Sequence, residues 1–141
     1  MNKPVRVVHY VNQFFAGLGG EEAANRAVEI RREPAGARPE RLRAAISPSI
    51  GPCCYEVDAP VIEAFAAAYG DRARSWMTPS RDAAHVMLDL WAANAALLEE
   101  AGVAPTRIEN PRVCTACYVE TLYSYRKGHK GRLATVAALH S

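Results

Sequence analysis

A proline-containing basic stretch divides the chain into two parts of unequal length. Residues 31–43 read RREPAGARPERLR, with five arginines, two prolines and a glycine. Proline and glycine interrupt regular structure, so this stretch predicts a boundary between residues 1–35 and residues 36–141. The chain has 141 residues, half of them apolar, which is enough for one hydrophobic core of ordinary size.

The charge balance excludes some classes of partner. Seventeen Lys and Arg residues against fifteen Asp and Glu give a formal charge of +2, too small to predict nucleic acid as a partner. No apolar run reaches the roughly 18 residues of a membrane span, and the N-terminus lacks the pattern of a signal peptide. We therefore expect no membrane partner, a cytoplasmic location and reduced cysteines.

The shorter part reads as a strand, a glycine loop and a helix. Residues 5–11 are β-branched and apolar, residues 17–20 contain three glycines, and residues 21–28 are rich in helix formers. A glycine loop before a helix can hold a phosphate, but this one lacks the dinucleotide and P-loop patterns. Because Glu21 and Glu22 would repel an anion, we interpret the loop as a turn.

The longer part contains two predicted helices. The first follows Asp58, has Pro60 in its first turn and ends at Gly70. The second covers residues 88–101, has apolar residues near the helical period and ends at Gly102.

Short strands are expected around these helices. They are residues 44–46, 55–57, 107–109, 122–126 and 133–139, the last two joined by a turn at 127–131. Residues 71–86 are expected to form an irregular loop. Strands and helices do not alternate strictly, so the predicted fold class is α+β, with a mixed sheet and packed helices.

Four cysteines raise the question of a zinc site. Cys114 and Cys117 have the spacing of metal ligands, whereas Cys53 and Cys54 are adjacent, which strains the chelation of one tetrahedral ion. Free cysteine commonly packs as a small hydrophobic side chain. We therefore favour buried free cysteines over a four-thiolate zinc site, and assign no metal ligand.

The histidines form no metal-binding or catalytic pattern. His9 lies in a predicted strand and is expected to be a core residue, and the others, His85, His129 and His140, have no suitably spaced partner. A serine nucleophile elbow is also absent from the sequence. No catalytic residue can therefore be assigned.

Two arginines border the predicted turn near the C-terminus. Arg126 follows Ser124 and Tyr125, and Arg132 follows Gly131. Both guanidinium groups can project near one end of a hairpin, where they suit a phosphate or a carboxylate. A solvated basic turn is an equally good interpretation from spacing alone.

The longer part resembles the C-terminal half of the YfiH-like laccase-domain family, whose members are also called multicopper polyphenol oxidases or peptidoglycan editing factors. Residues 44–57, AAISPSIGPCCYEV, are similar to a family segment, as are residues 88–94, LDLWAAN. The family's closing pattern is matched by residues 114–117, CTAC, then by 124–126, SYR, and by 131–132, GR. These separated motifs occur in the family's order from about residue 37 to residue 139.

The resemblance implies work on purine nucleosides. Family members are credited with zinc-dependent phosphorolysis of adenosine or inosine and with deamination of adenosine. Tyr125, Arg126 and Arg132 would then bind the substrate, a purine nucleoside, together with phosphate. The family's zinc is held by two histidines and one cysteine in segments that this sequence lacks, so zinc is implied as a cofactor while its ligands are expected to be absent.

Residues 1–35 resemble a different family, the N-terminus of the B component of glycine, sarcosine and betaine reductases. The similarity runs from VRVVHYV through the glycine loop to the following helix. The reductase's catalytic centre lies far downstream, so its chemistry is not carried over. The two resemblances meet near the predicted boundary, which suggests a chimera.

Three functional hypotheses follow. The chain is a purine nucleoside phosphorylase or adenosine deaminase relative, a non-catalytic module that binds nucleosides, or a fragment related to the reductase B component. A laccase-like part that lacks half its sheet exposes strand edges, which favour pairing with another chain. We therefore expect a homo-oligomer.

Overall fold

The structure is a computed structural model that describes residues 42–131 and 133. The strand, glycine loop and helix expected in residues 1–35 lie outside the described residues, as do Arg132 and nearly all of the strand expected at 133–139. The boundary between residues 35 and 36 also lies outside them and stays a prediction.

The described part has a mixed α/β fold with two small sheets, which confirms the predicted α+β class. A two-stranded parallel sheet pairs β1 (Ala44–Ala45) with β5 (Ile108–Glu109), and a three-stranded antiparallel sheet has the order β2–β4–β3. The other elements are β2 (Glu56–Val57), α1 (Ala59–Tyr69), η3 (Gly70–Trp76), β3 (Met77–Pro79), β4 (Val86–Leu88), α2 (Leu90–Glu100), η4 (Pro105–Arg107) and η5 (Tyr125–Lys127).

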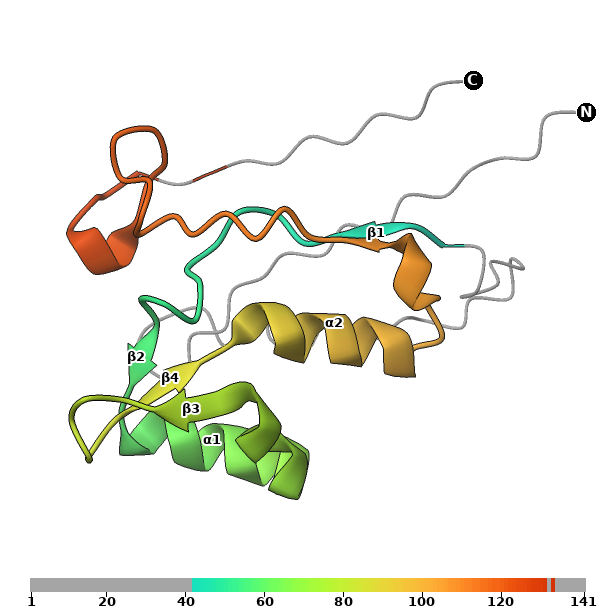
Figure 1. Ribbon diagram of the computed structural model, residues 1–141, viewed down its shortest axis with the longest axis horizontal. Coiled ribbons are helices and arrows are strands. Elements are labelled where there is room, and N and C mark those ends of the chain that lie inside the picture. The colour runs from blue at the N-terminus through green and yellow to red at the C-terminus, as the bar shows by residue number, and fades with distance from the viewer. Residues whose placement is uncertain (1–41, 132, 134–141) are drawn as a thin grey trace, which may run out of the picture.

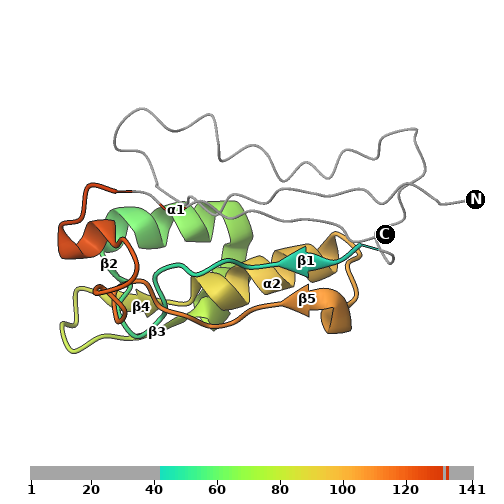
Figure 2. The same cartoon turned by 90° about the horizontal axis from the view of Figure 1, so that it is seen from above.

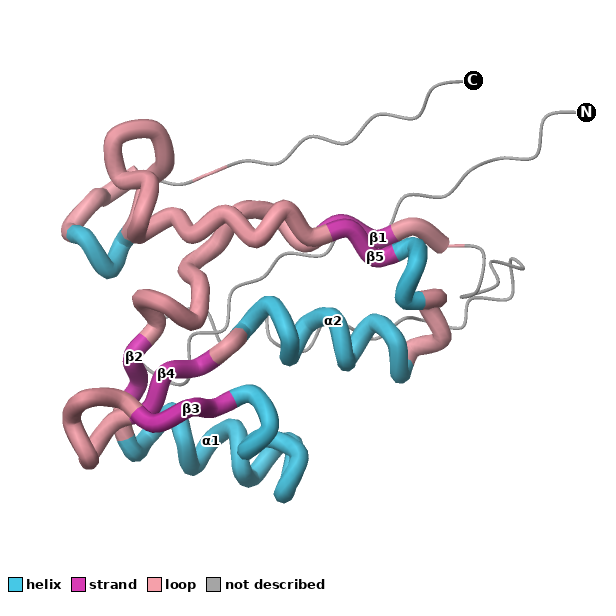
Figure 3. Tube along the Cα trace, in the orientation of Figure 1, coloured by secondary structure: helices cyan, strands magenta, loops and turns pink. Residues whose placement is uncertain are grey.

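Helix α2 occupies the middle of the fold. In Figure 1 it runs between the β1–β5 sheet above and the three-stranded sheet with α1 below. Figure 2, turned by 90°, shows β1 and β5 beside one end of α2 and the loops next to them running along the helix, with α1 on another side. Loops make up most of the described chain after β5 (Figure 3).

Two hydrophobic clusters meet at α2. The first joins α2 to α1, η3 and the three-stranded sheet, and its buried members are Val57, Phe65, Ala73, Trp76, Leu88, Leu90 and Ala93. The second joins α2 to the β1–β5 side, and its buried members are Ile46, Trp91, Leu98, Val103, Cys114 and Ala116. A helix that is apolar on more than one face needs such burial on both sides.

Helix α1 begins and ends as the sequence predicts. Proline at the second helical position suits the first turn, and Gly70 ends the helix with φ of 61°, a left-handed conformation that favours glycine. Asp58 is the N-cap residue, but its side chain accepts no capping hydrogen bond. Of the predicted apolar face, Phe65 is buried and Ala68 is exposed, because the next element covers only part of the helix.

Helix α2 starts two residues later than predicted, because Leu88 belongs to β4. The side chain of Asp89 caps the helix by accepting a hydrogen bond of 2.9 Å from the backbone N–H of Ala92. The helix ends at Glu100, and Gly102 follows with φ of 95°. Both predicted helices are therefore confirmed with small shifts at their ends.

Two local predictions are wrong. Residues 71–86 were expected to be an irregular loop, but they contain η3, β3 and the start of β4, because Ala73 and Trp76 are buried in the core and fix this segment. Residues 122–126 were expected to form a strand, but they form no strand and run into η5, where the N–H of Gly128 donates to the carbonyl of Tyr125. Within residues 42–131, no helix is long and apolar enough to cross a membrane.

Candidate metal centre and adjacent cationic pocket

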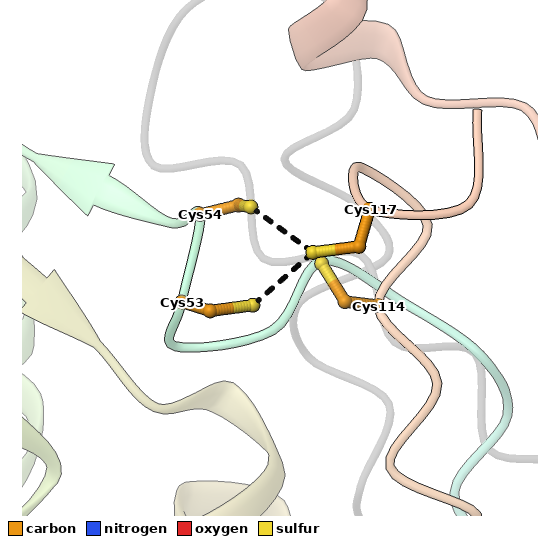
Figure 4. A group of neighbouring side chains, drawn as sticks. All are labelled: Cys53, Cys54, Cys114 and Cys117. Atoms are coloured by element: carbon orange, nitrogen blue, oxygen red, sulfur yellow. Dashed lines mark hydrogen bonds between the residues drawn. The ribbon is translucent and has the colours of Figure 1, made fainter.

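The four cysteines converge on one point. The Sγ atom of Cys117 lies 3.6 Å from that of Cys53 and 3.5 Å from that of Cys54. All four Sγ atoms, including that of Cys114, lie within 4.8 Å of one another. Figure 4 shows the four side chains pointing toward one another from two separate segments.

Backbone turns aim these side chains. The N–H groups of Cys54 and Tyr55 both donate to the carbonyl of Gly51, so the chain turns tightly around Cys53. In the second segment, the N–H groups of Cys117 and Tyr118 both donate to the carbonyl of Cys114. Each turn therefore presents two sulfur atoms to the other segment.

The two segments are also joined to each other. The N–H of Ser49 donates to the carbonyl of Val113, and the N–H of Thr115 donates to the carbonyl of Ser49, at 3.3 and 3.0 Å. The N–H of Gly51 donates to the Sγ atom of Cys114 at 3.2 Å. The relative position of the two cysteine pairs is thus fixed by main-chain contacts.

The sequence-based interpretation of the cysteines is wrong. Only Cys114 is buried, and Cys54 is half-buried against the second cluster, whereas Cys53 and Cys117 are exposed and do not pack as core side chains. The expectation that metal ligands are absent is also wrong, since the four sulfur atoms form a candidate ligand set. The turn after Gly51 brings both sulfurs of the adjacent pair to the same side, where each lies within 3.6 Å of the sulfur of Cys117.

The thiols differ in acidity. Desolvation of the sulfur, followed by its hydrogen bond with Cys117, raises the pKa of Cys53 to about 12, and the same two causes raise the pKa of Cys54. Burial opposes ionisation of Cys114, but hydrogen bonds from the backbone N–H groups of Gly51 and Cys117 lower its pKa to about 7. Cys114 is therefore a stronger acid than Cys53 or Cys54.

A cationic pocket adjoins the cysteine turn. It has a volume of about 530 Å³, within the roughly 300–1,000 Å³ of small-molecule sites. Its lining includes both sulfur-bearing residues of the first pair, three cations and one carboxylate, and consists of Pro52, Cys53, Cys54, Glu56, Pro79, Ser80, Arg81, Met87, Arg126 and Lys127. Glu56 accepts a hydrogen bond from the hydroxyl of Ser80, so the carboxylate is partly satisfied within the wall.

Arg126 is held in place on this pocket. Its guanidinium donates to the backbone carbonyl of Glu56 at 2.8 Å and lies 5.3 Å from the ring centroid of Tyr55. Burial raises the pKa of Tyr55 and Arg126 lowers it, with burial the stronger, so the ring stays neutral and suits a stacked cation. The neighbouring Tyr125 is 80% exposed, and Arg132 lies outside the described residues.

The described histidines lie apart from the cysteines. The Nδ1 atom of His85 is 2.9 Å from a carboxylate oxygen of Asp82, and the ring of His129 makes an edge contact with Tyr123. Among residues 42–131, the four cysteines are the one group of three or more metal-ligating side chains. The one sequence signal for this site was the CxxC spacing of Cys114 and Cys117. The turn at Gly51, which the spacing does not report, adds Cys53 and Cys54 to complete the group of four cysteines.

The fold is that of the YfiH-like proteins. The structure aligns with that of a hypothetical protein YfiH from Bacillus licheniformis with a TM-score of 0.61 and 34% identity, covering 70% of this chain and 36% of that chain. The family described as multi-copper polyphenol oxidoreductase laccase matches residues 10–140. The chain therefore belongs to this family, as the sequence resemblance implied.

Curated relatives carry names from purine metabolism. The chain is 40% identical over 108 residues to a purine nucleoside phosphorylase of Deinococcus radiodurans, covering 74% of this chain and 38% of the relative. It is 37% identical over 93 residues to an adenosine deaminase from an unknown prokaryotic organism, covering 65% of this chain and 35% of the relative. The chain thus spans little more than a third of the length of either relative.

A short stretch matches a different enzyme complex. The chain is 56% identical over 34 residues to the sarcosine reductase complex component B subunit beta of Peptoclostridium acidaminophilum, covering 24% of this chain and 8% of that subunit. The second resemblance seen in the sequence is therefore confirmed as a short similarity.

Proposed function

We propose that this chain binds phosphate and a purine nucleoside in the cationic pocket and so contributes to a nucleoside phosphorylase reaction. The observation that carries the proposal is the fixed guanidinium of Arg126 on a pocket with two further cations. Arginine N–H groups match phosphate oxygens in pairs, and the excess of positive charge favours an anion. The names of the relatives supply the substrate class.

The residues divide the task by their chemistry. Arg126, Lys127 and Arg81 neutralise the phosphate charge in the pocket. Tyr125 does not line the pocket, and its contact with the purine base is proposed from the family resemblance alone. Arg132, which follows a few residues later in the sequence, is proposed as a further phosphate contact. In phosphorolysis a phosphate oxygen forms a bond to C1′ of the ribose while the bond from C1′ to the base nitrogen breaks, and the base takes up a proton. These cations orient the attacking phosphate.

The zinc ligand set implied for the family does not fit the described residues. That set has two histidines and one cysteine, whereas His85 and His129 are engaged elsewhere and the cysteines gather without a histidine. Copper(II) also does not fit, because it prefers nitrogen and oxygen ligands in a tetragonal geometry. The proposed binding of phosphate and nucleoside in the pocket therefore involves neither zinc nor copper.

Binding without turnover is the second candidate function. This candidate is favoured because the described residues that gather as metal ligands are four cysteines, which leave no coordination position open to a substrate. A module of this kind would hold a nucleoside and phosphate while another polypeptide supplies the reacting groups. The two candidates differ only in whether the bond to the base is broken.

The test combines calorimetry and product analysis on the full chain. We expect phosphate and inosine to bind to the unaltered chain. R126A should weaken phosphate binding about tenfold, which is the lower end of the free-energy contribution of a hydrogen bond to a charged group, because Arg126 is exposed to solvent. R74A removes an exposed arginine of η3 and is the matched control, with unchanged binding.

Product analysis then separates the candidates. Release of free purine base that requires phosphate supports the phosphorylase role. Conversion of adenosine to inosine without phosphate supports a deaminase role instead. Binding with no product in either assay supports the binding module. If neither phosphate nor nucleoside binds, or if R74A weakens phosphate binding as much as R126A does, the proposed pocket is wrong.

A further inference from the structure

We infer that the four cysteines form a structural zinc site, with Cys53, Cys54, Cys114 and Cys117 as the ligands of a single ion. The inference does not depend on the proposed function of the pocket. It rests on the positions of the sulfur atoms, on the backbone that holds them and on the chemistry of a four-sulfur ligand set.

The sulfur positions fit one tetrahedral ion. A zinc–sulfur bond is about 2.3 Å long, which places the four sulfurs of a tetrahedron about 3.8 Å apart. The two closest pairs here, both involving Cys117, lie 3.6 and 3.5 Å apart, and every pair lies within 4.8 Å. Small side-chain rotations would therefore complete the coordination without moving the main chain.

The backbone supplies the surroundings that thiolate ligands need. The N–H of Gly51 donates to the Sγ atom of Cys114, which orients this ligand and spreads its charge. The hydrogen bonds between Ser49 and the second segment hold both turns at a fixed separation. The site is therefore organised before an ion arrives, which lowers the entropy cost of binding.

The ligand set is closed. Four protein sulfurs fill a tetrahedral coordination sphere, so no position remains for water or substrate, and such sites are structural. A tetrahedral set of four sulfurs is typical of zinc or iron. Three of the four cysteines are not buried, and zinc has no redox chemistry that exposure to solvent could disturb. These points favour zinc.

The ion would stabilise the least regular part of the fold. It would join the turn before β2 to the segment after β5, where the described chain is mainly loop (Figures 3 and 4). Residues 110–124 contain no helix or strand, so they are held by turns and by the bridge between Ser49 and Cys114 rather than by a regular hydrogen-bonded element. Because the ligands come together only in the folded chain, metal binding would be coupled to folding.

The first experiment uses the unaltered full chain. After chelation and reduction, the protein is titrated with cobalt(II) and zinc, and its metal content is measured by elemental analysis after gel filtration. We expect one zinc per chain, thiolate-to-cobalt charge-transfer bands with the visible spectrum of a tetrahedral site, and displacement of cobalt by zinc. We also expect zinc to raise the melting temperature and to protect the thiols from a thiol-specific reagent.

Variants then identify the ligands. C53S, C54S and C117S, each made singly, should lower zinc affinity more than about 100-fold, beyond the loss seen when groups that merely support a metal ligand are changed. H85Q is the matched control, because it removes a side chain of metal-ligating type outside the cluster and should leave zinc content unchanged. Circular dichroism shows which variants fold, and the titration of the unaltered chain stands if one does not.

Several results would overturn the inference. These are a protein that keeps no zinc after loading, iron or copper in place of zinc, cobalt spectra without thiolate bands, or disulfides linking the cysteines in protein purified under reducing conditions. Loss of zinc in H85Q would also contradict the assignment. Failure of nucleoside or phosphate binding would leave the zinc site intact, so the two proposals fail separately.

Discussion

Replacement of Gly51 by alanine tests how tightly the cysteine turn is packed against α2. A Cβ atom at this position would lie 2.5 Å from Cη2 of Trp91 and 2.9 Å from Cζ2, closer than side chains approach. The indole ring cannot move away freely, since it is 6% exposed and its Nε1–H donates to the hydroxyl of Ser49 at 2.8 Å. Overpacking of this kind costs about 1–3 kcal/mol.

The assay is urea unfolding of the full chain with a double-mutant cycle. We expect G51A to lower the free energy of unfolding by about 2 kcal/mol. In a W91L background the ring is gone, so the same substitution should cost less by at least about 1 kcal/mol, because residues in contact do not act additively. G70A is the control, because nothing lies within 4 Å of its added Cβ and its cost comes from a φ of 61°.

Two results would refute this reasoning. One is a cost for G51A below about 0.5 kcal/mol, the range of ordinary surface substitutions. The other is the same cost for G51A in both backgrounds, which would mean that Trp91 is not the obstacle. The cost of G70A should be the same with and without the indole.

Three further predictions use other parts of the molecule. D89A should lower the free energy of unfolding by about 1 kcal/mol, because it removes the side-chain cap of α2. D58A, at the start of α1, should change the free energy of unfolding by less than about 0.5 kcal/mol, because Asp58 makes no side-chain cap. Urea unfolding measures both variants. Hydrogen bonds from the backbone N–H of Ala84 and from His85 lower the pKa of Asp82. The stabilisation of the fold by this carboxylate is therefore present above the ordinary carboxyl pKa and lost as pH falls through the lowered pKa. The difference in melting temperature between the unaltered protein and D82N should shrink in acid, and a difference that persists in acid would contradict this prediction. Sedimentation at high concentration should show a homo-oligomer, since the β1–β5 sheet has two strands within the described part of the chain and both can offer an edge. A monomer at every concentration would contradict this prediction.

The sequence predicted the helices better than the segments between them. Helices α1 and α2 have stop signals at Gly70 and Gly102, and their apolar residues follow the helical period, so both were identified with small errors at their ends. The segment from Gly70 to Leu88 was not, because its structure depends on Trp76, which packs against Tyr69 with ring centroids 5.3 Å apart. A single aromatic residue carries no periodic signal, and only the tertiary contact fixes its neighbours.

The candidate site shows the same limit. The CxxC spacing of Cys114 and Cys117 was visible in the sequence, but the pairing with Cys53 and Cys54 joins residues about 60 positions apart. Spacing rules describe local geometry and do not report which turns meet in space. The prediction of Tyr125, Arg126 and Arg132 as substrate-binding residues came from resemblance. The pocket lining includes Arg126 and not Tyr125, while Arg132 lies outside the described residues.

The central place of α2 has a consequence for how the molecule opens. Leu90 and Ala93 belong to one cluster and Trp91 and Leu98 to the other, so a single helix forms a wall of both. Detaching either side would leave an apolar face of that helix in water, which weakens the remaining side as well. Amide protons of both halves should therefore exchange with solvent in one concerted event, as expected of a single cooperative unit.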